Sequence, residues 1–288
     1  MSEALKDLIA LLSLDSAGEN IWRGLGSKND GAEGTYGGHF LGQATAAAQL
    51  SVAPDRYIHS LHGYFLRGGV PGEPYDYHVE NVRDGRTFSH RRVTAMQNGK
   101  AMFDLLAAFM AAEDGRRIKS EPPEDFGDLP EPESLPRYHE MMANLDEQPL
   151  PEEWALREHG VDIRNINAPW NEQGPSARGG IRHWIRSNGT APNNRALHAA
   201  MLAYQSDESV SDNILIPFGL TWGTPGITFV SLDHAMWFHR EVDLNEWHFV
   251  EQWPEAGGHG RGLAHGKVWS RSGELIASFS QEALMRLD

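Results

Sequence analysis

The chain contains two related aromatic segments at a fixed spacing. Leu61–Arg67 reads Leu-His-Gly-Tyr-Phe-Leu-Arg, and Asp233–Arg240 reads Asp-His-Ala-Met-Trp-Phe-His-Arg. Their closing arginines are 173 positions apart (67 to 240), and the turns Asn98-Gly99 and Ser272-Gly273 are 174 positions apart (99 to 273). Two segments in the same order and at nearly the same spacing indicate an internal duplication. We therefore predict a folding unit that is built twice.

The first copy combines one small-residue helix with several strands. The Ala-rich run Ala44–Leu50, which follows Tyr36–Gln43, favours a helix, because alanine has the highest helix propensity. The turns Asp84-Gly85 and Asn98-Gly99 are strong hairpin signals. Before the helix we expect another helix over 5–12 and a short strand over 20–25, and after it strands over 57–67, 74–83, 86–97 and 100–111.

The second copy repeats this order, which predicts an α+β protein. A helix over 193–206 precedes the second aromatic segment, with strands near 180–187, 214–221, 226–240, 246–254, 262–271 and 274–286. We expect a first unit over 1–112, a Pro-rich acidic connection over 113–179 with short helices near 136–145 and 151–158, and a second unit over 180–288. The copies are expected to share one sheet, which leaves neither with a long bare edge.

Composition excludes several classes of protein. The 288 residues carry a formal net charge of −15, which argues against a nucleic-acid partner because phosphates need a basic face. There is no cysteine, so disulfides, thiolate metal sites and a cysteine nucleophile are excluded. No apolar run reaches the roughly 20 residues that span a bilayer. A cytoplasmic location is the expectation.

Familiar hydrolase and metal signatures are absent. The chain has no Gly-x-Ser-x-Gly elbow and no His-Glu-x-x-His motif. The pairs His59/His62 and His234/His239 would each be split between two faces of a strand, where side chains alternate. We therefore expect no metal site.

Three polar residues of the second copy occupy positions where an apolar residue would be usual. Asp207 follows the predicted helix 193–206, where a carboxylate faces the negative end of the helix dipole. Ser231 would share a strand face with Phe229 and Asp233. Gln281 stands where the 174-residue spacing places Ala107 in the first copy, and a buried glutamine needs a hydrogen-bond partner. Each also has an ordinary interpretation, namely a solvated helix end, a small strand residue or a solvent-facing strand position.

Over nearly its whole length the chain resembles the acyl-CoA thioesterase II family, whose TesB-like members have a double hotdog fold. The motifs that carry the resemblance are Tyr36–Gln43, His59–Arg67, Arg83–Phe88, Arg91–Val93, Gln97–Lys100, Ala203–Asp207, Leu232–Arg240 and Gln281–Arg286. Their number and order make the resemblance far more specific than one short motif.

The resemblance implies hydrolysis of fatty acyl-CoA to a fatty acid and CoA. It assigns Asp207, Ser231 and Gln281 to the binding of the attacking water, and the family often has Thr where this chain has Ser231. Backbone N–H groups over 189–194 are the expected oxyanion donors. No cofactor is implied. Candidate substrate-binding residues are Gly38, His39 (where the family more commonly has Gln), His62, Arg83, Arg86, Arg91 and Arg92.

Two other functions are compatible with the same scaffold. A double-hotdog enoyl-CoA hydratase would use an Asp/His pair, but Asp233 and His234 are adjacent on a strand and should face opposite sides. An acyl-CoA-binding module without activity is the other, and the presence of Asp207, Ser231 and Gln281 weighs against it. Hotdog sheets commonly associate, so a homodimer or homotetramer is expected.

Overall fold

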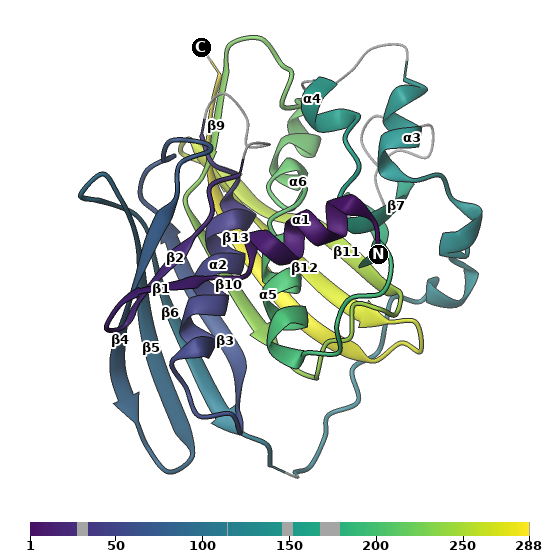
Figure 1. Cartoon of the computed structure of the whole chain (residues 1–288). Helices are drawn as coiled ribbons and strands as arrows, with labels where there is room; N and C mark the ends of the chain where they lie inside the picture. The colour runs from purple at the N-terminus through teal and green to yellow at the C-terminus, as the bar shows by residue number, and fades with distance from the viewer. Residues whose placement is uncertain (28–33, 114, 146–151, 168–178, 288) are drawn as a thin grey trace.

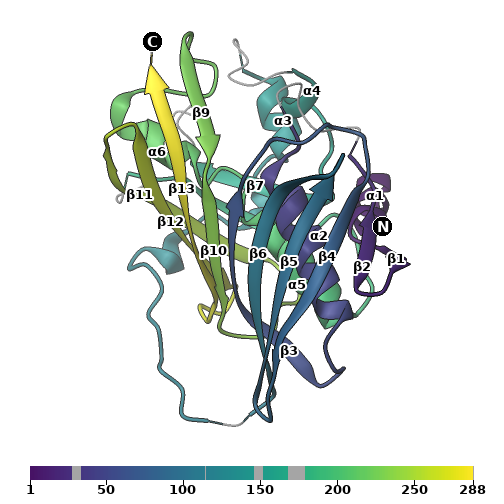
Figure 2. The same cartoon turned by 90° about the vertical axis from the view of Figure 1, so that its left-hand side faces the viewer.

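A computed structural model describes residues 1–27, 34–113, 115–145, 152–167 and 179–287. Within these residues, thirteen strands form one antiparallel sheet in the order β1-β2-β4-β5-β6-β3-β10-β13-β12-β11-β8-β7, with β9 paired to β13. The sheet curves around helices α2 and α5, which lie side by side at its centre (Figures 1 and 2). This confirms the α+β class and the predicted unit of a helix wrapped by a curved sheet.

The first half follows the prediction closely. Asn98 and Gly99 both have positive φ, 50° and 74°, as the tight hairpin between β5 and β6 requires. The elements are α1 (Glu3–Leu11), β1 (Asp15–Gly18), β2 (Ile21–Gly24), α2 (Gly37–Leu50), β3 (Arg56–Phe65), β4 (Tyr75–Asp84), β5 (Phe88–Gln97) and β6 (Lys100–Ala111).

The middle of the chain contains a strand that the sequence analysis missed. Strand β7 (Val161–Asn167) lies inside the predicted connection, yet it pairs with β8 and extends the second half of the sheet. Strand β7 is preceded by η1 (Phe126–Asp128), η2 (Pro132–Ser134), α3 (Tyr138–Ala143) and α4 (Glu152–Ala155).

The second half contains β8 (Arg182–Ser187), α5 (Arg195–Gln205), α6 (Asp212–Leu215), η3 (Ile216–Phe218), β9 (Ile227–Ser231), β10 (Asp233–Phe238), β11 (His248–Gly258), β12 (Arg261–Ser270) and β13 (Leu275–Leu287). The predicted strand over 214–221 is wrong, because α6 and η3 occupy most of that range. Pro217 has no N–H for a sheet ladder, and Gly219 closes the 3-10 turn in a left-handed conformation with φ +67°.

The predicted strand over 226–240 is broken into β9 and β10 at Leu232. In the first copy, β3 has a register shift against β6 between Ile58 and Ser60. The 173-residue spacing places that irregularity at 231–233, so both copies interrupt the strand at the same point. The break shifts the alternation of side chains, which matters for the site described below.

Strand register shows that the two copies are related by an approximate two-fold axis. β3 and β10 pair antiparallel at the centre of the sheet, and His62 faces Ala235, its own counterpart at 173 residues. Ser231 faces Ala283 just as Ile58 faces Phe109. Gln281 lies where Ala107 lies, and His234 lies where Leu61 lies. The two sequence spacings, 173 and 174, are therefore preserved in the hydrogen-bonded sheet.

Small residues bring α2 and α5 close together. A Cβ on Gly42 would lie 3.0 Å from Tyr204 Cβ, and Gln49 Nε2 donates to Ala196 O at 2.9 Å. Because the helices run antiparallel, the N-terminal end of each lies beside the C-terminal end of the other.

Within the described residues, no helix is both long and apolar enough to cross a membrane.

Candidate active site

The carboxylate of Asp207 lies at the seam between the two copies. Asp207 follows α5 and is only 8% exposed, and its Oδ2 accepts a hydrogen bond from the Gly38 backbone N–H of α2 at 2.8 Å. The N-terminal end of α2 carries a positive partial charge, which compensates for the unfavourable end of α5. The compensation that the sequence analysis required thus comes from the helix of the other copy.

Two glycines make room for this contact. A Cβ on Gly37 would lie 2.7 Å from Asp207 Oδ2 and 2.9 Å from Phe65 Cε1. A Cβ on Gly38 would lie 2.2 Å from the carbonyl oxygen of Tyr204. Both distances are shorter than real Cβ contacts, so any side chain at these positions would displace the carboxylate or separate the helices.

Burial raises the pKa of Asp207 to about 6, and the charge of Asp212 raises it further. The Gln281 amide and the Gly38 N–H lower the pKa of Asp207, because both interact favourably with its ionised form. The second oxygen, Oδ1, is buried and makes no hydrogen bond within the described part of the chain. A carboxyl group with a pKa near 6 can accept a proton at neutral pH, which is the property a general base needs.

Gln281 connects Ser231 to the interior of the second copy. It is fully buried on β13, and its Nε2 donates to Ser231 Oγ at 2.7 Å. Its Oε1 lies 2.5 Å from Nδ1 of His234. The structure therefore brings Asp207, Ser231 and Gln281 together, although Ser231 and Gln281 are 50 residues apart in the chain.

His234 is the residue of this cluster that the sequence analysis did not identify. Its Nε2 lies 3.0 Å from Ser206 Oγ, and burial lowers its pKa to about 4, so the ring is neutral at neutral pH. A neutral ring that faces Gln281 Oε1 must carry its proton on Nδ1, which leaves Nε2 as an acceptor 3.0 Å from Ser206 Oγ, while the Ser206 hydroxyl also lies 2.9 Å from Ala203 O. This arrangement turns the NH₂ group of Gln281 toward Ser231 and Asp207. The comparison that revealed Gln281 opposite Ala107 would also have revealed His234 opposite Leu61.

The break at Leu232 corrects one expectation about this strand. Ser231 was expected to share a face with Asp233, but it is His234 that joins Ser231 at Gln281. Asp233 points elsewhere and accepts a hydrogen bond from the Glu282 backbone N–H at 2.9 Å. The predicted divergence of Asp233 and His234 is confirmed, since His234 is 1% exposed and bonds to Gln281 instead.

The predicted substrate-binding histidines lie at different depths. His39 is fully buried in α2 beside Gly38 and makes an edge-to-face contact with Tyr75, with ring centroids 5.5 Å apart. His62 is exposed on the outer face of β3, where its ring meets Trp237 at 5.2 Å. His62 therefore faces away from the side of the sheet that holds Gln281 and His234.

The four predicted arginines are not gathered around Asp207. Arg91 is buried and donates to Ser51 and Asp84 at the C-terminal end of α2, whereas Asp207 contacts the N-terminal end. Fourteen helical residues separate these ends by about 20 Å. Arg83 and Arg86 are exposed, and Arg92 is exposed and paired with Asp104.

The expected oxyanion donors are also at the wrong end of a helix. Residues 189–194 precede α5, and Asp207 follows it, so the eleven residues of α5 lie between them. The backbone N–H group that hydrogen-bonds to Asp207 belongs to Gly38 in the N-terminal turn of α2, in the first copy. No cluster of three or more His, Asp or Glu side chains suited to a metal ion occurs among the described residues.

Comparisons with known proteins show the family of the chain. A family model described as acyl-CoA thioesterase matches residues 161–284, and one described as the acyl-CoA thioesterase N-terminal domain matches residues 26–110. Acyl-CoA thioesterase 2 of Haemophilus influenzae is 34% identical over 99% of both chains. The human acyl-coenzyme A thioesterase 8 is 32% identical over 96% of this chain and 88% of its own.

Solved structures share the whole fold. The acyl-CoA thioesterase II TesB2 of Mycobacterium marinum superposes with a TM-score of 0.79 at 32% identity, covering 98% of both chains. A hot dog fold protein of Alicyclobacillus acidocaldarius superposes with a TM-score of 0.74 at 20% identity, covering 98% of both chains, and shows the fold alone.

Proposed function

The chain belongs to the acyl-CoA thioesterase family and is an acyl-CoA thioester hydrolase, and we propose that it cleaves fatty acyl-CoA with a water molecule held by Asp207, Ser231 and Gln281. The observation that carries this proposal is the Asp207 carboxylate. One of its oxygens is fixed by Gly38, and the other is buried beside the Gln281 amide without a hydrogen bond from the described residues.

The proposed reaction needs one general base and no covalent intermediate. The water oxygen attacks the thioester carbonyl carbon, and its proton passes to Asp207. The tetrahedral intermediate then collapses and the C–S bond breaks, and the leaving CoA thiolate takes the proton that Asp207 received, which restores the carboxylate. The products are a fatty acid and CoA. No metal or other cofactor takes part in this scheme.

Ser231 and Gln281 would act by positioning. The Gln281 amide donates to Ser231 Oγ and interacts with Asp207, so we propose that a water bound to Asp207 is held by these groups together. Holding the nucleophile in a near-attack geometry is among the largest available sources of rate enhancement.

One assay distinguishes this function from the two alternatives. Thiol release and ultraviolet absorbance are measured with palmitoyl-CoA, decanoyl-CoA and crotonyl-CoA, using the native chain and Asp207→Ala. We expect thiol release from the saturated esters and a loss of several orders of magnitude in Asp207→Ala. Absorbance loss with crotonyl-CoA but no thiol release would identify a hydratase instead. Absence of both signals would identify a binding module.

We also infer a homo-oligomer. The outer face of the central strands exposes Tyr64 on β3, Leu106 on β6 and Trp237 on β10. Exposed apolar side chains grouped on one face are typical of protein–protein contacts. Light scattering of the purified chain tests this inference, and a monomer at micromolar concentration would contradict it.

A further inference from the structure

The approximate two-fold axis creates a second position equivalent to the Asp207 site. At the Asp207 site, the C-terminal end of α5 meets the N-terminal turn of α2 through Asp207 and Gly38. At the other end of the helix pair, Gln49 near the C-terminus of α2 meets the N-terminal turn of α5 by donating to Ala196 O at 2.9 Å. The two contacts are counterparts, and Gln49 stands where the carboxylate stands in the first site.

The second position has lost the groups that the proposed reaction needs. By strand register, Ile58 replaces Ser231, Ala107 replaces Gln281 and Leu61 replaces His234. Ile58, Ala107 and Leu61 are buried apolar residues. None of these three side chains can hold a water, and Gln49 cannot deprotonate one in the way proposed for Asp207.

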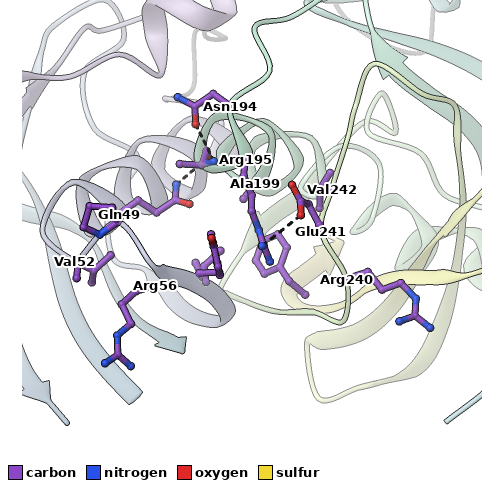
Figure 3. Close-up of a pocket in the computed structure, with 15 residues that line it drawn as sticks. Gln49, Val52, Arg56, Asn194, Arg195, Ala199, Arg240, Glu241 and Val242 are labelled. Carbon is purple, nitrogen blue, oxygen red and sulfur yellow. Dashed lines mark hydrogen bonds and ion pairs between the residues drawn. The ribbon is translucent and has the colours of Figure 1, made fainter. Parts of the chain in front are cut away.

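The second position has nevertheless kept a cavity, which we call the twin pocket. It has a volume of about 210 Å³ and lies between the C-terminal end of α2 and the N-terminal end of α5 (Figure 3). Gln49 and Ile58, the counterparts of Asp207 and Ser231, both line it. Phe238 also lines it, 173 residues after Phe65, which lies beside Gly37 near Asp207.

The twin pocket carries cationic side chains in an acidic protein. Arg56, Arg195 and Arg240 line it together with a single acidic residue, Glu241, although the chain as a whole has a net charge of −15. Arg56 and Arg240 lie on opposite sides of the cavity in Figure 3, and Arg195 comes from the start of α5.

The ion pair of Arg195 leaves room for a competing anion, whereas Arg56 and Arg240 direct their guanidinium groups away from the cavity (Figure 3). Arg195 lies 3.4 Å from Glu241 and stacks over the Tyr57 ring at 3.5 Å, and Arg240 lies 3.4 Å from Glu274. Both carboxylates are more than half exposed, and exposed ion pairs contribute little. Arg56 donates to the carbonyl oxygens of residues 85–87 and lies 3.8 Å from the exposed Asp55. The remaining lining, which includes Val52, Ala199 and Val242, is mainly apolar.

We propose that the twin pocket binds an acyl anion without hydrolysing it. Such a ligand combines an apolar chain with a negative group, as a fatty carboxylate or a CoA ester does. The apolar lining and the Arg195 guanidinium, which lies between the lining residues Glu241 and Tyr57, match these two parts. The choice of acyl compounds as ligands rests on the proposed function of the Asp207 site. The presence of the cavity and of its positive charge does not depend on that function.

Calorimetric titration tests the proposal with two hydrolysis-inert probes, decanoate and S-decyl-CoA, a thioether without a carbonyl group. We expect the native chain to bind two equivalents of at least one probe per chain. Arg195→Glu should weaken one of these sites by at least about tenfold, because charged hydrogen bonds are lost. A glutamate is favourable at the first turn of α5, so the variant should fold. Arg195→Lys, which keeps the charge, should bind within a few fold of the native chain.

Two controls separate this result from general effects of charge and from the catalytic proposal. Arg23→Glu reverses a surface arginine that is also ion-paired, to Asp76, far from the twin pocket, and should leave both sites intact. Ala53→Trp places bulk at the exposed rim of the pocket without changing charge and should weaken the same site as Arg195→Glu. Hydrolysis of decanoyl-CoA should persist in Arg195→Glu and be lost in Asp207→Ala.

The two probes also identify the negative group. Arg195-dependent binding of decanoate alone assigns the pocket to carboxylates, and such binding of S-decyl-CoA alone assigns it to CoA esters. A single binding site in the native chain, or two sites that are both insensitive to Arg195→Glu and Ala53→Trp, would overturn the proposal. A chain without thioesterase activity that still shows Arg195-dependent binding would instead refute the proposed function of Asp207.

Discussion

Asp207 of the second copy accepts a hydrogen bond at 2.8 Å from the backbone N–H of Gly38 in the first copy. This contact joins the C-terminal end of α5 to the N-terminal end of α2, so the proposed base is held by both halves of the duplication. The contact fixes the carboxylate in a buried position where its ionised form is disfavoured. The predictions below follow from that conflict between position and solvation.

Asp207→Asn should stabilise the fold at neutral pH while it removes activity. The folded-state pKa of about 6 exceeds the ordinary value of 3.8, so the ionised group costs ~3 kcal/mol of folding free energy above pH 6. This cost develops between pH 3.8 and 6 and is absent below that range. Asparagine keeps an oxygen for the Gly38 N–H. Urea unfolding should show a higher free energy of unfolding for Asp207→Asn than for the native chain at pH 7.5, and this difference should disappear at pH 4. An equal difference at both pH values would refute the buried-charge account.

Thioesterase activity should depend on one ionisation with a pKa of about 6. A base that is protonated cannot accept the proton of water, so kcat/KM should fall about tenfold for each pH unit below 6. His234, with a pKa lowered to about 4, stays neutral across this range and should not contribute. The profile is measured with decanoyl-CoA between pH 4.5 and 8.5. A flat profile from pH 5 to 7 would remove Asp207 from the role of base.

Gly37→Ala should damage the site more than the fold. The new Cβ would lie 2.7 Å from Asp207 Oδ2, so the carboxylate must shift. A displacement near 1 Å can cost about a hundredfold in rate, and we expect a loss of that size in kcat/KM. Gly127→Ala is the matched control, because it meets no atom within 4 Å and has no positive φ. Native activity in Gly37→Ala would show that the Asp207 carboxylate is not constrained there.

The duplication could be predicted because repeated segments are visible in the sequence itself, whereas the roles of Asp207, Ser231 and Gln281 come from the family resemblance and stay predictions. Repeated aromatic segments fixed the spacing, and that spacing survives as strand register across β3 and β10. The predictions that were wrong concern which face a side chain occupies and which elements lie side by side, and both depend on three-dimensional packing. The break at Leu232 changes the face of Asp233, and the antiparallel helices place the first turn of α2, rather than residues 189–194, beside Asp207.

The predicted arginines illustrate a different limit. The sequence made Arg91 a candidate for substrate binding, but in the structure its guanidinium donates hydrogen bonds to Ser51 and Asp84. A sequence shows that an arginine is present, but not whether its donors are already engaged. The cations that line the twin pocket are Arg56, Arg195 and Arg240, which lie far apart in the chain and come from the start of β3, the start of α5 and the segment after β10.

His234 should act as a positioning residue for Gln281. Its Nδ1–H faces Gln281 Oε1 at 2.5 Å and thereby fixes which end of the amide points to Ser231 and Asp207. His234→Leu restores the residue of the first copy, where Leu61 is fully buried, so the fold should tolerate the shape. Without the donor, the amide can rotate, and we expect kcat to fall about tenfold to a hundredfold with KM nearly unchanged. His234→Asn offers an N–H near the Nδ1 position and should recover part of kcat. Equal kcat in His234→Leu and the native chain, or a change confined to KM, would show that the histidine only fills space.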